Sequence, residues 1–386
     1  MALETFSQQL AGWVELNLKN CIGVDECMKV CPVVDPELTI AELNEASKPD
    51  EASKPGTSLT EATLKFAADC VQCGRCDSVC PTIAGRSIMM LGLKEKMASS
   101  GKSPLSHKKY FALKGFDKSP LRRTAFNTFI KAKWKFSETD KPKYDKLARH
   151  IDKDNFKKSE YLFYFGCYIF TKEESTIQCL DIADKLKIDY EVLGGLKSCC
   201  GWPSLLAGRT GEAEDYHEHL KELIEKSDPK YVITGCAECY MSLNKVNAKY
   251  KMKFEALTTP MWLNMFKDRL GLTKSDARVT FHDSCNISRK LGMPEPARQL
   301  LDHLNPSVEM ERSGQKDTYC CGYWGLHNDP EILKKIHQSR FDEAKATGVK
   351  TMVVECITCL ESFSKSAEGS GLKIVDIVSL VHDRMR

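Results

Sequence analysis

The sequence predicts a multidomain fold in which an all-α N-terminal domain precedes two repeated α/β half-domains. Three observations predict it. The 18 cysteines of this 386-residue chain fall into separate groups. A five-cysteine pattern occurs twice, about 120 residues apart. Short apolar runs that end beside these cysteines alternate with polar, helix-forming stretches, which is typical of parallel α/β units.

Length and composition narrow the class of protein. The chain is long enough for two to three domains of roughly 100–200 residues, and 42% of its residues are hydrophobic. A chain with cores of this size does not need disulfides for stability. Residues 1–6 show no signal peptide, and no run of about 18 apolar residues predicts a membrane span. We therefore expect a cytoplasmic protein whose cysteines bind metal.

The first cysteine group has the ligand spacing of a two-cluster ferredoxin. The motif C-x2-C-x2-C-x3-C-P consists of Cys70, Cys73, Cys76 and Cys80, followed by proline. In two-cluster ferredoxins the first three thiolates hold one cluster, and the fourth ligates the other. By this rule Cys31, from an earlier motif, completes one [4Fe–4S] cluster. The separation of about 40 residues between the motifs, with an exposed loop over residues 45–60, predicts a helical ferredoxin-like domain over residues 1–100.

The second N-terminal cluster is one ligand short. The earlier motif, C-x5-C-x3-C-P, begins at Cys21 and has Val24 where the ferredoxin template requires a cysteine. The thiols left for this cluster are Cys21, Cys27 and Cys80. We predict a [3Fe–4S] cluster, and the alternative is a [4Fe–4S] cluster with an unusual fourth ligand, for which Asp25 is the nearest candidate. The spacing resembles the three-iron site of succinate dehydrogenase iron–sulfur subunits.

The remaining cysteines form the repeat. Each copy has a single cysteine, then Cys-Cys-Gly, then C-x2-C. The first copy contains Cys167, Cys199, Cys200, Cys236 and Cys239, and the second contains Cys285, Cys320, Cys321, Cys356 and Cys359. Strands are predicted at 161–166, 231–235, 278–282 and 351–355, and each leads towards a cysteine at its carboxyl end, where parallel sheets place their ligands. Helices are predicted over 212–226 and 330–347.

Two smaller expectations accompany the repeat. Gly201 and Gly322, which follow the cysteine pairs, are expected to adopt positive φ or to allow close backbone approach. Cys179 lies outside the pattern, in a helix-like stretch, and is expected to be a small buried hydrophobe rather than a ligand.

The two copies resemble the tandem cysteine-rich (CCG) domains of heterodisulfide reductase. They read C-x31-CCG-x34-C-x2-C and C-x34-CCG-x33-C-x2-C. The resemblance implies two noncubane [4Fe–4S] clusters, each held by the five cysteines of one copy. It also implies that a disulfide is reduced or formed between them, each cluster taking one sulfur onto an iron. Electrons would arrive one at a time from the ferredoxin-like part, and the chain would be an oxidoreductase subunit.

Two other interpretations stay open. Iron–sulfur subunits of glycolate, lactate and glycerol-3-phosphate dehydrogenases share this architecture, so the chain is alternatively an electron-relay subunit of a flavin-dependent dehydrogenase or a quinone-linked respiratory complex. Expected partners are a flavoprotein, a membrane cytochrome or quinone-reactive subunit, and a thiol or disulfide substrate. Zinc in one CCG domain is the third interpretation, because C-x2-C is also a zinc signature.

Reducing a disulfide also requires protons. His282 and Asp283, close to Cys285, are the candidate proton donors, since histidine titrates near neutral pH. A purely structural role for His282, as a hydrogen-bonded residue at a strand end, is the alternative. No glycine-rich nucleotide-binding motif is present, so flavin or nucleotide binding is expected in a partner.

The cysteine-free middle of the chain carries its positive charge. Residues 86–159 contain 20 Lys and Arg against 7 Asp and Glu. Within this stretch Phe126, Phe129, Ile130 and Trp134 share one helical face. Residues 121–136 therefore either contact an anionic membrane or a partner, or pack their apolar stripe on the α/β unit. No nucleic-acid-binding motif accompanies the charge. The predicted boundaries are 1–100, a connecting segment 101–158, and half-domains 159–275 and 276–386.

Overall fold

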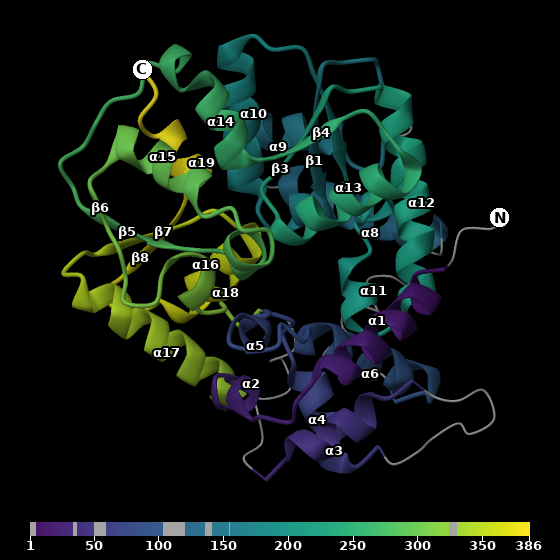
Figure 1. Ribbon diagram of the computed structural model, residues 1–386. Helices are drawn as coiled ribbons and strands as arrows, with labels where there is room; N and C mark the ends of the chain where they lie inside the picture. The colour runs from purple at the N-terminus through teal and green to yellow at the C-terminus, as the bar shows by residue number, and fades with distance from the viewer. Residues whose placement is uncertain are drawn as a thin grey trace.

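The protein is described from a computed structural model of the chain (Figure 1). The structure describes residues 5–33, 37–49, 59–102, 120–135, 141–153, 155–323 and 330–386. Most of the expected exposed loop at 45–60, and residues 103–119 and 136–140 of the basic segment, lie outside the described residues. In Figure 1 the purple N-terminal helices lie together on one side of two sheet-containing parts, coloured teal and green-to-yellow.

The described N-terminal residues are helical. The helices are α1 (Phe6–Asn20), α2 (Glu26–Lys29), α3 (Ile40–Ser47), α4 (Glu61–Asp69), α5 (Arg75–Ser78) and α6 (Arg86–Ser99). Capping boxes begin two of them, because Thr5 and Thr39 each exchange hydrogen bonds with the residue three positions later. Helix α1 packs along α6. The all-α expectation holds for these residues, and the likeness to ferredoxin stays a prediction.

The first half-domain is a four-stranded parallel sheet with the order β2-β1-β3-β4. Its strands are β1 (Tyr161–Gly166), β2 (Tyr190–Gly194), β3 (Tyr231–Thr234) and β4 (Glu255–Thr258). Its helices are η2 (Cys167–Phe170), α10 (Glu173–Leu186), η3 (Leu196–Ser198), α11 (Trp202–Leu206), α12 (Thr210–Ser227), α13 (Ala237–Tyr250), α14 (Thr259–Phe266) and η4 (Lys267–Arg269). Every residue of β1 is buried, as expected for a parallel strand covered on both faces.

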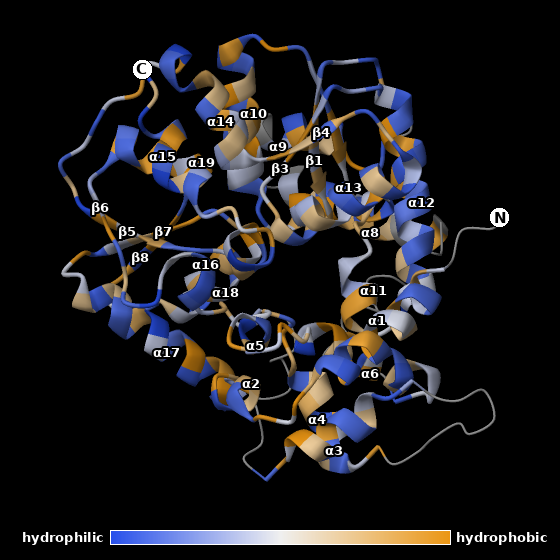
Figure 2. Ribbon diagram, in the orientation of Figure 1, coloured by the Kyte–Doolittle hydropathy of each residue, from blue (hydrophilic) through white to orange (hydrophobic). Residues whose placement is uncertain are grey.

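The second half-domain repeats this topology as β6-β5-β7-β8, again parallel. Its strands are β5 (Val279–His282), β6 (Ser307–Val308), β7 (Thr351–Val354) and β8 (Lys373–Asp376). Its helices are η5 (Cys285–Lys290), α15 (Glu295–Leu304), α16 (Gly314–Asp317), α17 (Pro330–Ala346), α18 (Ile357–Ser366) and α19 (Ile377–His382). The four strands and two helices predicted from the repeat are therefore confirmed, with ends that differ by one or two residues. Central strands are orange in Figure 2, and outer helices carry blue faces.

The basic segment forms two helices, α8 (Pro120–Lys135) and α9 (Lys141–Ala148), beside the first half-domain. Ile130 and Trp134 are buried and Phe126 packs against the same core, so the packing interpretation is confirmed for these three side chains. Phe129 is 67% exposed, contrary to the expected shared face. At 3.6 residues per turn, Phe129 is rotated about the helix axis by about 100° from the middle of the face that the other three side chains share.

No helix in the described parts of the chain is both long and apolar enough to cross a bilayer. Membrane contact through residues 121–136 stays a prediction.

Gly208 joins the N-terminal helices to the first half-domain. It follows α11 with φ +74°, and a Cβ added there would overlap the backbone carbonyl of Lys94 in α6. The backbone cannot move away without separating α6 from α11, which pack together.

We therefore predict that Gly208→Ala destabilises the protein by more than about 2 kcal/mol, because positive φ and a backbone clash both oppose it. The measurement is thermal unfolding of the anaerobically purified protein. Gly211→Ala is the control: it lies in the first turn of α12 with nothing within 4 Å of the new methyl, and is expected to be neutral or slightly stabilising. Equal melting of both variants and the parent would contradict this account of the contact.

Candidate functional site

The ten cysteines of the repeat converge at the carboxyl edges of the two sheets. In each half-domain one cysteine follows the first strand directly or within three residues, and the C-x2-C pair begins two residues after the end of the third strand. Cys236 and Cys356 are the N-cap residues of α13 and α18. This follows from parallel sheet geometry, which brings the carboxyl ends of all strands to one edge.

Within each half-domain the thiols touch in the same order. In the first-repeat site (Cys167, Cys199, Cys200, Cys236 and Cys239), contacts run from Cys167 to Cys199, Cys200, Cys239 and Cys236. The second-repeat site (Cys285, Cys320, Cys321, Cys356 and Cys359) shows the matching chain from Cys285 to Cys320, Cys321, Cys359 and Cys356. The structure therefore groups the two sets of five as the repeat predicts.

The glycine after each cysteine pair has the expected conformation. Gly201 and Gly322 have φ of 74° and 73°, where a side chain would be strained. The Gly322 amide donates a hydrogen bond to the Cys320 sulfur at 3.4 Å. Cys179 is buried in α10 and belongs to the hydrophobic core, as expected for a cysteine that is not a ligand.

The N-terminal cysteines gather around two neighbouring cavities. One is lined by the three-cysteine site, Cys21, Cys27 and Cys80, together with Val24. The other is lined by the four-cysteine site, Cys31, Cys70, Cys73 and Cys76. This grouping matches the pairing inferred from the two-cluster rule. Cys27 borders both cavities, so the two sites are adjacent.

Thiol contacts also join the N-terminal region to the second-repeat site. A hydrogen bond from the Cys320 thiol lowers the pKa of Cys73 to about 6. Arg289 reinforces the junction, because its guanidinium donates to the Cys73 carbonyl at 3.0 Å and to the Thr318 carbonyl. The four-cysteine site and the second-repeat site are therefore in direct contact.

Glu238 lies between the two repeat sites. Its carboxylate is 3.2 Å from the Cys236 sulfur and 3.9 Å from the Cys356 sulfur, and it accepts a hydrogen bond from Asn286 at 3.0 Å. The Ala237 amide donates to the Cys356 sulfur at 3.4 Å. The buried Glu238 carboxylate and the backbone at Ala237 thus lie between the two sets of thiols.

A cavity of about 200 Å³ opens at the first-repeat site. All five first-repeat cysteines line it, and no second-repeat cysteine does. The other lining residues are Phe126, Ile130, Tyr168, Phe170, Thr171, Leu196, Trp202, Pro203, Glu238, Tyr323, Ile357, Thr358 and Glu361. The two repeat sites are therefore alike in their thiols and unlike in their surroundings.

The residues present fit iron–sulfur clusters. Thiolate-only donor sets of three to five, mostly buried, are what such clusters use. Arg86 borders both N-terminal cavities, and its buried Nε and Nη1 have no hydrogen-bond partner among the described residues. Buried donors are normally paired, and cluster sulfides would pair these two. Among the same residues, no group of His, Cys, Asp and Glu has the geometry of a single-ion site.

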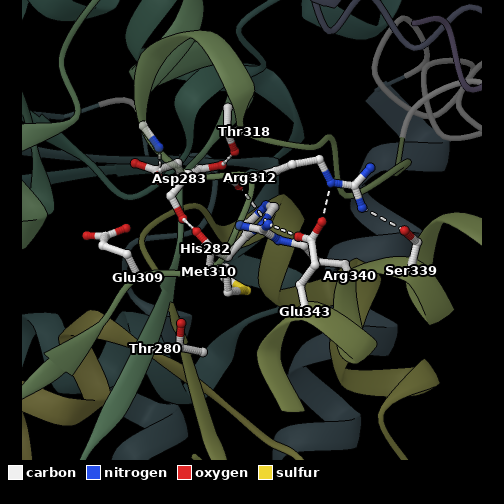
Figure 3. A network of polar contacts seen from close by, with 12 residues as sticks. Thr280, His282, Asp283, Glu309, Met310, Arg312, Thr318, Ser339, Arg340 and Glu343 are labelled. Carbon is white, nitrogen blue, oxygen red and sulfur yellow. Dashed lines mark hydrogen bonds and ion pairs between the residues drawn. The ribbon is translucent and has the colours of Figure 1, made fainter. Parts of the chain in front are cut away.

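His282 and Asp283 lie in a buried polar network of the second half-domain (Figure 3). His282 accepts a hydrogen bond from Arg340 at 3.0 Å, and burial together with the Arg340 charge holds its pKa well below the ordinary value. Asp283 receives two hydrogen bonds from Arg298 at 2.6 and 2.9 Å and one from the Gly314 amide. Neither residue lines the cavity, so this geometry supports structural roles, and proton donation by them stays a prediction.

Sequence reasoning missed three features of the site. Glu238 sits inside the first C-x2-C loop, where a charged residue between two ligands was the available signal. Phe126 and Ile130 form part of the cavity wall. Their only signal in the sequence was the amphipathic pattern of the helix, and that pattern did not indicate which part of the protein the apolar face would cover. Arg86 stands at the edge of the basic segment, and the charge of that segment does not distinguish it from its neighbours.

Comparisons with known proteins agree with these features. Residues 161–244 and 279–364 each match the family described as the cysteine-rich domain, CCG. The chain is 24% identical to a subunit of the fumarate reductase (CoM/CoB) of Methanothermobacter marburgensis, over 94% of this chain and 71% of that protein. It is 24% identical to a subunit of the dihydromethanophenazine:CoB–CoM heterodisulfide reductase of Methanosarcina acetivorans, over 95% and 93%. It is 21% identical to an EtfAB:quinone oxidoreductase of Syntrophomonas wolfei, over 97% and 59%.

The fold and the thiol sites thus define an iron–sulfur oxidoreductase with tandem cysteine-rich domains. Residues 161–244 and 279–364 are CCG cysteine-rich domains, and the resemblance to heterodisulfide reductase-like iron–sulfur proteins that was inferred from the cysteine spacing is confirmed.

Arg86 provides a test of the N-terminal cluster sites. Its Nη2 lies 3.6 Å from the Cys21 sulfur and 2.6 Å from the Asn44 side-chain oxygen. Because a buried cation stabilises the more negative, reduced state of a cluster, we predict that Arg86→Gln lowers the midpoint potentials of both N-terminal clusters. The expected shift is roughly 60 mV, equivalent to about 1.4 kcal/mol for a one-electron couple.

An EPR-monitored redox titration measures these potentials. Arg86→Lys keeps the charge and should shift them less. Lys350→Gln, at an exposed position that directly precedes β7 at the amino end of the strand, away from the thiols, removes the same charge and should leave them unchanged. Unaltered potentials in Arg86→Gln would show that no cluster lies beside this guanidinium.

Proposed function

We propose that this chain is the iron–sulfur subunit of a redox complex and reduces, or in the reverse direction forms, a disulfide at the first-repeat site. The relatives named as reductase subunits support a complex with further subunits. One-electron carriage and Lewis-acidic iron are the chemistry that clusters supply when bound at these four thiol sites.

The observation that carries the proposal is the unbroken series of thiol sites that ends at a cavity. The three-cysteine site adjoins the four-cysteine site through Cys27, and the latter adjoins the second-repeat site through Cys73 and Cys320. Glu238 then joins the second-repeat site to the first-repeat site, which alone among the four opens on the 200 Å³ cavity in the described residues. This arrangement supports a path for electrons from the N-terminal region to a substrate.

The reaction consumes two electrons and two protons, because one S–S bond of the substrate breaks and two S–H bonds form. The electrons come from a partner subunit that acts as the electron donor. The chain itself supplies a largely apolar cavity that limits water at the reacting sulfurs, and places first-repeat thiolates on its wall.

The environment of Val24 supports a three-iron cluster at the three-cysteine site. Val24 lines the cavity with the three thiols. Asp25, the alternative fourth ligand, does not line it; it forms an ion pair with Lys29 at 2.9 Å and is 60% exposed. Glu26 also lines the cavity, but its carboxylate is paired with Lys29 at 2.9 Å, so the apolar Val24 side chain leaves the fourth corner of the cluster without a protein ligand.

The metal content tests the cluster assignment. Anaerobically purified protein is expected to contain about 15 iron atoms per chain, from one [3Fe–4S] and three [4Fe–4S] clusters. Iron and acid-labile sulfide analysis, with EPR, measures this. About seven irons together with one zinc would contradict both noncubane clusters and favour the zinc interpretation.

Val24→Cys tests the vacancy directly. The added thiol completes the ferredoxin motif, so we predict that the EPR signal of an oxidised three-iron cluster disappears and a reducible four-iron signal replaces it. Ile83→Cys is the matched control, since Ile83 is 86% exposed and does not line this cavity. An unchanged spectrum in Val24→Cys would refute the three-iron assignment.

Electron relay to a quinone is the second candidate function, because the chain is similar over 97% of its length to an EtfAB:quinone oxidoreductase. The two functions differ in what the oxidised protein binds. A thiol or disulfide that changes the EPR signal of the oxidised protein supports disulfide chemistry, and indifference to every such compound supports relay.

A further inference from the structure

We propose that the outer face of α8 binds the surface of an anionic lipid bilayer. This inference goes beyond the proposed function and does not depend on it. The observations that carry it are two protruding apolar side chains on that face and the positive charge of the helix that bears them.

The inner face of α8 is occupied by packing within the protein. Ile130 and Trp134 are 8% and 3% exposed, and Phe126 packs edge-on against Phe170 with ring centroids 5.3 Å apart. Trp134 also stacks on Tyr144 of α9, with ring centroids 5.6 Å apart. These contacts attach α8 to the first half-domain, so its attachment does not explain apolar residues on any other face.

The outer face nevertheless carries two large apolar side chains. Leu121 is 84% exposed and Phe129 is 67% exposed; among the described residues only Ile83 is a large apolar residue with a higher exposed fraction. At 3.6 residues per turn, Leu121 lies about 180° from the middle of the inner face and Phe129 about 100° from it. The neighbouring exposed positions of this face are uncharged: Thr124, Ala125 and Thr128.

The charge of α8 is entirely positive. Its 16 residues include five basic residues and no acidic one, and Lys131 is exposed about 80° around the helix from Leu121. Two acidic side chains bond to α8 towards its inner face: Glu173 accepts from the Trp134 indole at 3.3 Å, and Asp152 accepts from Asn127 at 2.8 Å. A surface that approaches the outer face therefore meets cations, which anionic headgroups complement.

This combination is typical of a helix that lies in the interface plane of a membrane. Apolar side chains enter the boundary between headgroups and acyl chains, while lysine stems extend along the apolar surface and place their ammonium groups among the phosphates. An acidic protein would also be attracted by the basic residues. Vesicles contain lipid alone, so binding to them distinguishes the two occupants.

Co-sedimentation of the anaerobically purified protein with vesicles tests the proposal. One set of vesicles contains phosphatidylcholine only, and the other contains an equal mixture of phosphatidylcholine and phosphatidylglycerol. We expect the partition coefficient to be at least about tenfold higher for the anionic vesicles at low salt, and to fall as salt is raised. Equal partition into both sets, or no binding to the anionic set, would overturn the proposal.

A double variant locates the contact on α8. Leu121→Ser with Phe129→Ser should lower the partition into anionic vesicles at least about tenfold, because it removes the apolar groups that enter the bilayer. The matched control is Leu16→Ser with Met265→Ser, which removes two exposed apolar side chains from α1 and α14 and should leave the partition unchanged.

All four of these side chains are exposed, so both double variants should keep the iron content and melting temperature of the parent protein. Phe129→Trp, which keeps a large ring suited to the membrane interface, should bind at least as tightly as the parent. Equal partition of the two double variants would contradict the assignment to this face.

A charge reversal tests the electrostatic part of the argument. Lys131→Glu should weaken binding to the anionic vesicles roughly five- to tenfold at low salt and should have little effect at high salt, where exposed charges are screened. Lys350→Glu makes the same change at an exposed position before β7 and should have no effect. An equal loss in both variants would show that net charge, rather than α8, determines binding.

Vesicle binding requires no turnover, so the two proposals can fail separately. Binding that follows these expectations in a protein that reduces no disulfide would leave the membrane contact standing and refute the proposed reaction. A protein that reduces disulfides but ignores anionic vesicles would refute the membrane contact alone.

Discussion

Parallel strands end at a common edge of their sheet, and this geometry underlies every thiol site of the repeat. In each half-domain the single cysteine and the C-x2-C pair follow two strand ends at that edge, and the Cys-Cys-Gly loop brings the other two thiols to it. The two edges meet, because the Ile357 amide donates to the Gly235 carbonyl at 3.0 Å across the half-domains. Ten cysteines spread over about 190 residues of sequence thereby lie in two adjoining groups.

In the second half-domain, buried charged residues form hydrogen bonds that hold this edge in place. Arg298 and the Gly314 amide fix Asp283, and Arg340 links His282 to Glu343. These bonds position the turn that carries Cys285 and the loop that leads to Cys320. Removing one partner of such a buried ion pair is strongly destabilising, because it leaves an uncompensated buried charge. His282, a residue type suited to proton transfer, is thereby held in this network beside the ligand loops.

The two half-domains share a topology but have diverged in their surroundings. The second-repeat site faces the N-terminal helices, where Arg289 binds the Cys73 carbonyl. The first-repeat site faces α8. The apolar side chains of this helix line a cavity there, whereas the second-repeat site contacts an N-terminal site. In the proposed function, the second-repeat site would adjoin the electron path and the first-repeat site would meet the substrate. The cysteine pattern, which is the same in both copies, contains no sign of that difference.

Which cysteines act together can be predicted from the order of residues alone. Local spacing fixes ligand sets such as Cys70 to Cys76, and the 120-residue repeat fixes the two groups of five, because both are properties of neighbouring residues and of strand periodicity. What each set faces follows instead from tertiary packing: Glu238 between the repeat sites, Arg86 between the N-terminal sites, and Phe126 on the cavity wall. These contacts join segments separated by tens to more than a hundred residues, and their partners are chosen by how the domains pack, which no local pattern records.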